Sequence, residues 1–231
     1  MSRKSDIEAL INRAEKSLPK IIEEYEKSLH AKTIQADLKI DIKDYFGNLR
    51  SVLDYLAHDI VDKYCPKAKQ KDILYFPIRL DQGSFDSLMQ KSYPDLKTAS
   101  NTVYDILESI QPFKTPMNQW LTHFNKLNNE NKHERLVAQT RSETKRVNVQ
   151  IKSGGSVSWD PTAVKFGSGV FIGGVPVNPQ TQMPVPSETQ SVSIETWVDF
   201  QFEGINVSAI WLTTESLKQI KQIYDRLKSN L

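Results

Sequence analysis

The feature that most constrains the fold is a change in the spacing of apolar residues near residue 145. Before it, apolar residues recur every three or four positions over long stretches, which is the period of an amphipathic helix. After it, they alternate with polar residues, most clearly over 192–202, as in a strand with one buried face. The sequence therefore predicts an α+β fold. An antiparallel helical bundle is expected over 1–142, and an antiparallel β unit with a C-terminal helix over 143–231.

Two long helices are predicted at the start of the chain. Apolar residues fall at helical spacing over 7–29 and again over 38–64, and the short link between them is typical of an antiparallel pair. Ser5 and Glu8 have the spacing of a capping box, which predicts a helix start at Ser5. Pro19 lacks the N–H that a helix interior uses, so we expect a kink or a break there.

Shorter helices are expected before residue 145. Residues 84–90 are predicted to form a helical turn, and a third helix is expected after Pro94. A fourth should begin at Thr115, because Pro116 then occupies the first helical position, where its missing N–H costs nothing.

The strands are expected to be joined by glycine-containing turns. Gly154-Gly155 predicts one turn, and the segment 207–211 is expected to return antiparallel to 192–202. A final helix should begin at Thr213 or Thr214. The pattern leaves open whether this helix packs on the bundle or on the β unit.

Composition excludes several classes of protein. Hydrophobic residues make up 39% of the 231 residues and charged residues 25%, with a net charge of +2, which is ordinary globular usage. No apolar run is long enough to cross a membrane, and the N-terminal residues lack the apolar core of a signal peptide. The single cysteine, Cys65, excludes an internal disulfide. We expect a soluble cytoplasmic protein.

Several catalytic motifs are missing. The sequence has no phosphate-binding P-loop, no dinucleotide-binding glycine pattern before a helix, and no nucleophile elbow. Glu130 and His133 match half of a di-iron ligand pattern, but no second pair follows. Asp54, His58 and Asp62 share one helix side, which we interpret as a solvated polar face. We therefore predict no cofactor and no metal site.

Charge is unevenly distributed along the chain. Residues 114–152 hold eight basic and three acidic residues, whereas residues 153–215 hold one basic and six acidic residues. One interpretation is that these two segments face each other within the molecule. The other is that the basic segment meets an anion such as nucleic acid.

A polar cluster at 127–135 is the most informative local feature. If the fourth helix continues through it, Asn128, Asn131 and Arg135 follow Trp120 and Phe124 on the inward face. Buried amides would then need hydrogen-bond partners. The alternative is that the helix ends at Asn128-Asn129 and a loop follows.

The second helix offers a partner for this cluster. Arg50 lies beside the apolar stripe, and Asp54 follows four residues later, so an ion pair between them is geometrically easy. The alternatives are an exposed pair on one helix and an Arg50 that reaches Asn128, Asn131 or Glu134 on the fourth helix.

These segments resemble a widespread group of uncharacterised bacterial proteins and, more distantly, HEPN domains. The resemblance covers roughly residues 34–137 and is carried by four motifs in this order: Asn48-Leu49-Arg50-Ser51-Val52-Leu53-Asp54-Tyr55-Leu56-Ala57, Phe76-Pro77-Ile78, Gln111-Pro112-Phe113, and Leu127-Asn128-Asn129-Glu130-Asn131-Lys132-His133-Glu134-Arg135. It implies a helical bundle, often dimeric, and in many members a metal-independent ribonuclease activity.

The HEPN signature is an arginine followed after four to six residues by a histidine, and this sequence lacks it. Only Lys126 or Asn128 precedes His133 at a suitable distance. His133 is a candidate acid or base, and Lys126 a candidate phosphate-binding charge.

The resulting functional hypothesis is a bacterial cytosolic HEPN-like protein, linked to defence or stress, that binds RNA or a protein partner. One alternative is a metal-independent endoribonuclease with His133, Lys126 and Asn128 as catalytic residues. The candidate binding residues, whichever function holds, are Arg50, Asp54, Asn131, Lys132 and Arg135. Another alternative is a non-catalytic structural or oligomeric interaction module, for instance a homodimer.

Overall fold

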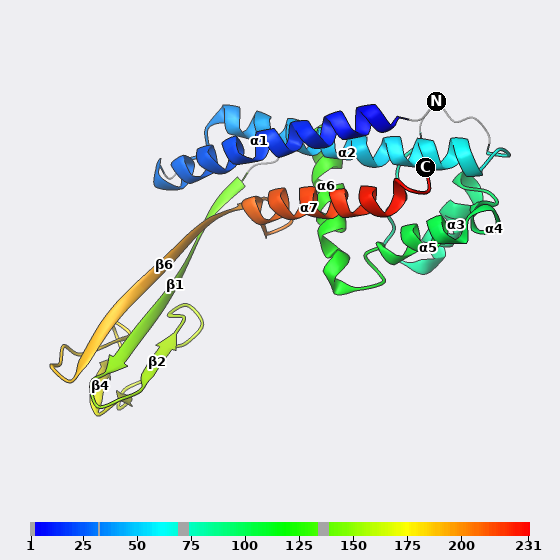
Figure 1. The fold of residues 1–231 in the computed structure, drawn as a ribbon. Helices are drawn as coiled ribbons and strands as arrows, with labels where there is room; N and C mark the ends of the chain where they lie inside the picture. Colours follow the sequence, from blue (N-terminus) through cyan, green and yellow to red (C-terminus); the bar gives the residue numbers. More distant parts are fainter. Residues whose placement is uncertain (1–2, 32, 69–73, 134–138) are drawn as a thin grey trace. The chain divides into compact units, whose positions relative to one another are not determined.

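The computed structural model describes residues 3–31, 33–68, 74–133 and 139–231 and combines helices with antiparallel sheets, as predicted (Figure 1). The chain divides into two compact units. The helical unit comprises residues 1–140 and 200–231, and the β unit comprises residues 141–199. We expected residues 143–231 to form one unit, but the C-terminal helix belongs with the other helices.

The first two helices form the long antiparallel pair that the sequence predicts. α1 spans Lys4–Ala31 and α2 spans Ala36–Tyr64. The predicted capping box is wrong, because the helix begins one residue earlier and the Arg3 carbonyl accepts the N–H of Ile7. α1 also continues through Pro19 without the predicted break. Buried apolar residues on both sides of this proline, Ala14 and Ile21, pack into the core and hold the helix together.

The remaining helices complete this unit. α3 spans Gln82–Ser92 and covers the predicted turn; the expected third helix is divided at Ser100 into α4 (Leu96–Ala99) and α5 (Asn101–Ser109). Thr115 caps a 3-10 turn, η1 (Pro116–Asn118), which leads directly into α6 (Gln119–His133). The Thr115 hydroxyl accepts the N–H of Met117, as expected for a cap.

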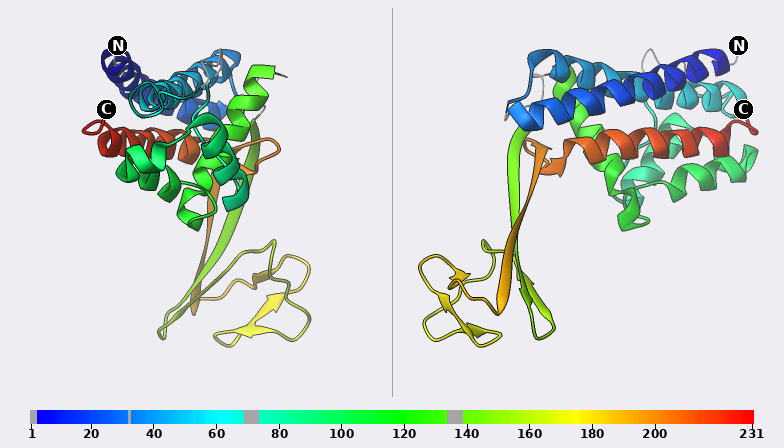
Figure 2. Two further views of the ribbon diagram at one scale, coloured as in Figure 1. Left: turned by 90° about the vertical axis from the view of Figure 1, so that its right-hand side faces the viewer. Right: turned by 60° about the vertical axis from the view of Figure 1, so that its left-hand side comes forward.

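α7, the C-terminal helix, spans Ala209–Leu227 and lies alongside α1 and α2 (Figure 2). Its cap is Ser208, whose hydroxyl accepts the N–H of Trp211. The predicted start at Thr213 or Thr214 is wrong, because both hydroxyls bond to carbonyls one turn earlier within the helix. Its apolar face, which includes Leu212, Ile220 and Leu227, is buried in the helical core.

The β unit is built on two long strands, β1 (Gln139–Ile151) and β6 (Gln190–Phe202). They lie side by side in a four-stranded sheet of order β2-β1-β6-β7, with β2 at Ser156–Trp159 and β7 at Val207–Ser208. β2 pairs antiparallel with β1, so that Val147 faces Trp159 and Val149 faces Val157. The predicted strand over 192–202 is confirmed, but the predicted strand over 207–211 shortens to two residues before α7 begins.

A second, three-stranded antiparallel sheet completes the β unit. It contains β3 (Phe171–Ile172), β4 (Val175–Asn178) and β5 (Met183–Pro184). This unit has its own small apolar core, separate from the helical one, made of Val147, Val149, Trp159, Ile172 and Val177.

The last residues of β6 belong to the helical unit. Phe200 and Phe202 are buried in the helical core, and the Phe200 ring meets the Tyr25 ring of α1 edge to face. The N–H of Phe200 donates to the Tyr25 hydroxyl at 2.9 Å. The last apolar residues of the alternating pattern, Phe200 and Phe202, therefore belong to the helical core.

Candidate functional site

The motif residues of α2 form a half-buried polar network. Arg50 and Asp54 lie one turn apart, and their side chains are only 17% and 20% exposed. Arg50 Nε donates to Asp54 Oδ2 at 3.1 Å, and Nη1 donates to Asn125 Oδ1 of α6 at 2.8 Å. The guanidinium also lies over the Tyr75 ring, 5.4 Å from its centre. The predicted ion pair is confirmed, and the bond from Arg50 to Asn125 joins α2 to α6.

Asp54 extends this network to the segment before α3. Its second oxygen, Oδ1, accepts the N–H of Phe76 at 2.9 Å. The Tyr93 hydroxyl donates to the neighbouring Tyr75 carbonyl at 3.0 Å. Burial, and then the nearby Asp54 charge, raise the pKa of Tyr93 far above its usual range. The phenol therefore remains a hydrogen-bond donor at any physiological pH.

Gln111 holds the same segment from the opposite side. Its side chain is fully buried, and its amide nitrogen donates to the carbonyls of Pro77 and Leu107, both at 2.8 Å. Its oxygen accepts the N–H of Arg79 at 2.9 Å. Backbone groups that have no ladder partner in an extended segment need such side chains. Three of the four motifs that carry the HEPN resemblance thus meet at this segment, and the contacts they make there are structural.

The polar end of α6 continues as helix to His133, so the alternative in which the helix ends at Asn128-Asn129 is wrong. Asn128 is half-buried, and its amide donates to the Phe124 carbonyl at 2.9 Å. The described side chain that binds Arg50 is that of Asn125, one turn before Asn128, whereas Asn128, Asn131 and Glu134 were the predicted partners. The side chains of Asn131, Lys132 and His133, and all of Glu134 and Arg135, lie outside the described residues.

Lys126 is held by groups of the helical unit. Its ammonium donates to the Gly204 carbonyl at 2.9 Å and lies 3.8 Å from Glu130 Oε1. Neighbouring His123, which the sequence reasoning missed, has a pKa below its usual value, because burial and then the Lys126 charge disfavour its protonated form.

The basic run 114–152 is divided between the two units. Lys114 binds Glu108 at 2.9 Å in the helical unit, where Lys126 also lies. Lys145, Arg146 and Lys152 belong to the β unit. The basic residues that follow one another in the sequence therefore belong to two different compact units.

The predicted polar face of α2 is also engaged. Asp54 pairs with Arg50, and Asp62 accepts from Arg3 Nη1 at 2.8 Å, as does Asp59. Within the described residues, no group of three or more histidine, cysteine or carboxylate side chains is placed to hold a metal ion.

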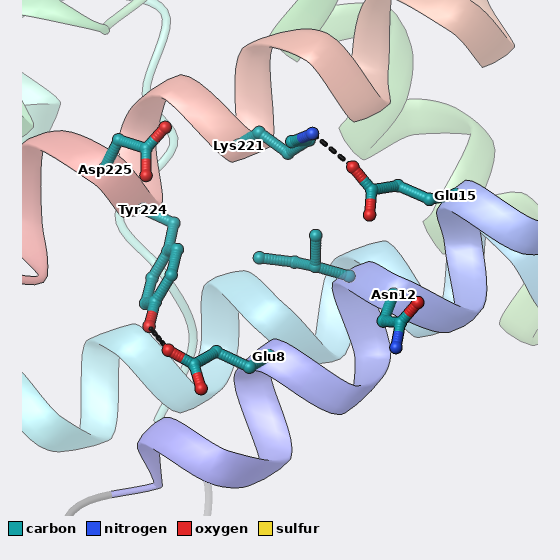
Figure 3. A pocket seen from close by; sticks show the side chains of 7 residues that line it. Glu8, Asn12, Glu15, Lys221, Tyr224 and Asp225 are labelled. Carbon is teal, nitrogen blue, oxygen red and sulfur yellow. Dashed lines mark hydrogen bonds and ion pairs between the residues drawn. The ribbon is translucent and has the colours of Figure 1, made fainter.

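A shallow pocket of about 210 Å³ lies between α1 and α7 (Figure 3). Lys221 pairs with Glu15 across it, and the Tyr224 hydroxyl donates to Glu8 Oε1 at 2.8 Å. Burial, and then this carboxylate, raise the pKa of Tyr224 to about 12. These bonds join the two helices to each other, so we interpret the pocket as part of the helix contact.

Exposed apolar side chains gather in the β unit. Among the described residues, eleven large apolar side chains are exposed, and six of them lie in this smaller unit. Phe171 on β3 is 62% exposed, and Ile194 and Val192 on β6 are 54% and 44% exposed. The others are Val157, Val164 and Val185. Large apolar side chains that stay exposed in a small unit favour a role for that unit in binding a partner.

Comparison of the chain with protein-family models, with curated proteins and with solved structures found no match. No helix in the described part of the chain combines the length and hydrophobicity needed to cross a membrane.

Proposed function

We propose that this chain is a non-catalytic, HEPN-like interaction module whose β unit binds a protein partner. The observation that carries the proposal is the exposure of Phe171, Ile194 and Val192 in a unit of 59 residues. Exposed apolar side chains cost free energy in water, and a protein surface that covers them recovers it. The helical unit, in this proposal, is the scaffold that carries the β unit.

The geometry favours this reading over the endoribonuclease. Of its three candidate catalytic residues, Lys126 and Asn128 already donate to backbone carbonyls, at Gly204 and Phe124. Arg50, the arginine of the first motif, pairs with Asp54 and is held by Asn125. A phosphate would have to compete with these contacts for the same side chains.

The geometry also favours a protein partner over RNA. Single-stranded RNA is usually bound by basic grooves with stacking aromatic residues. The described basic residues of 114–152 are divided between the two units, and Lys114 has an acidic partner. Exposed apolar side chains such as Phe171, Val192 and Ile194 suit a protein partner better than a phosphate backbone.

Site-specific photo-cross-linking in the native host tests the proposal. A photoreactive phenylalanine analogue is placed at position 171, and the control carries it at Met117, which is 81% exposed in the helical unit. We expect a discrete protein adduct at position 171 only, unaffected by ribonuclease. The purified partner should then bind the purified chain, and Phe171→Ser should weaken that binding about tenfold or more.

Two outcomes contradict the proposal. Identical adducts at both positions, or none at either, would remove the β unit as a specific protein-binding surface. An adduct that ribonuclease destroys would favour RNA as the partner.

A further inference from the structure

We draw no further inference here: the strongest candidate, the exposed apolar surface of β6 at Val192 and Ile194, carries nothing beyond the proposed function, because no feature of the described residues shows what covers it.

Discussion

Asp54 accepts the backbone N–H of Phe76 at 2.9 Å, although the two residues are 22 positions apart. The same carboxylate pairs with Arg50, so one side chain joins α2 to the extended segment before α3. Arg50 in turn binds Asn125 of α6. Residues that first suggested a nucleic-acid site are therefore committed to contacts within the helical unit.

These contacts predict that Arg50 and Asp54 are energetically coupled in the stability of the protein. Arg50→Ala and Asp54→Ala should each lower the free energy of unfolding by about 1–3 kcal/mol, because each leaves a half-buried charge without its partner. The double variant should lose less than the sum, with a coupling of about 0.5–2 kcal/mol. Urea unfolding measures these values, and strictly additive losses would show that the pair is energetically unimportant. Lys27→Met, which breaks two exposed pairs on α1, should leave stability nearly unchanged.

Asn125 should matter more than Asn128. Asn125→Leu removes the acceptor of Arg50 Nη1 and should destabilise by about 1–2 kcal/mol. Asn128→Leu removes only a bond to a carbonyl within α6 and should cost clearly less. Thermal melting of the two variants makes the comparison, and an equal or reversed order would contradict the assigned network.

His123 should make stability fall on acidification. Its folded pKa lies below the usual 6.5, so the unfolded chain takes up the proton first as the pH decreases. The contribution of this residue is therefore present above pH 6.5 and is lost as the pH falls through the folded pKa. His123→Gln should show a smaller loss of stability than the wild type between about pH 7.5 and about pH 5.5. Titration of the imidazole by NMR provides the direct check, and a pKa at or above 6.5 would refute the expectation.

Gly173 should be needed for the β unit. It has a positive φ of 54°, and a Cβ there would lie 2.8 Å from Ile151 Cδ1. Gly173→Ala should therefore destabilise this unit by about 1–3 kcal/mol, through backbone strain and overpacking. Hydrogen exchange at Val147 and Val149 reports the loss. Gly167→Ala, where a Cβ meets open space, is the control and should behave as the wild type.

An assay of ribonuclease activity distinguishes the non-catalytic interaction module from the endoribonuclease. We expect the purified full chain to leave single-stranded RNA intact in the presence of EDTA, because Lys126 and Asn128 bind carbonyls of the protein. Metal-independent cleavage that His133→Ala reduces about 10²-fold or more would reverse this conclusion. Binding without cleavage, steeply dependent on salt, would instead indicate an RNA-binding role.

Local patterns in the sequence were sufficient to predict the elements. The helices at 4–31 and 36–64, the Thr115 cap and the strand over 190–202 follow from apolar period and capping residues, which act over a few neighbouring positions. The Arg50–Asp54 pair was predictable for the same reason, because residues one turn apart on a helix are always neighbours.

Only the tertiary structure decided which distant residues meet. Asn125, which was not among the predicted partners Asn128, Asn131 and Glu134, binds Arg50, because the placement of α6 against α2 decides which turn faces the guanidinium. Gln111 became a central residue only once the segment 77–79 lay within reach of its amide. α7 joined the helices because its apolar face packs in the core that α1 and α2 share, and the Tyr45 hydroxyl donates to the Thr213 carbonyl there. Periodicity marks a buried face, but it carries no information about which surface will bury it.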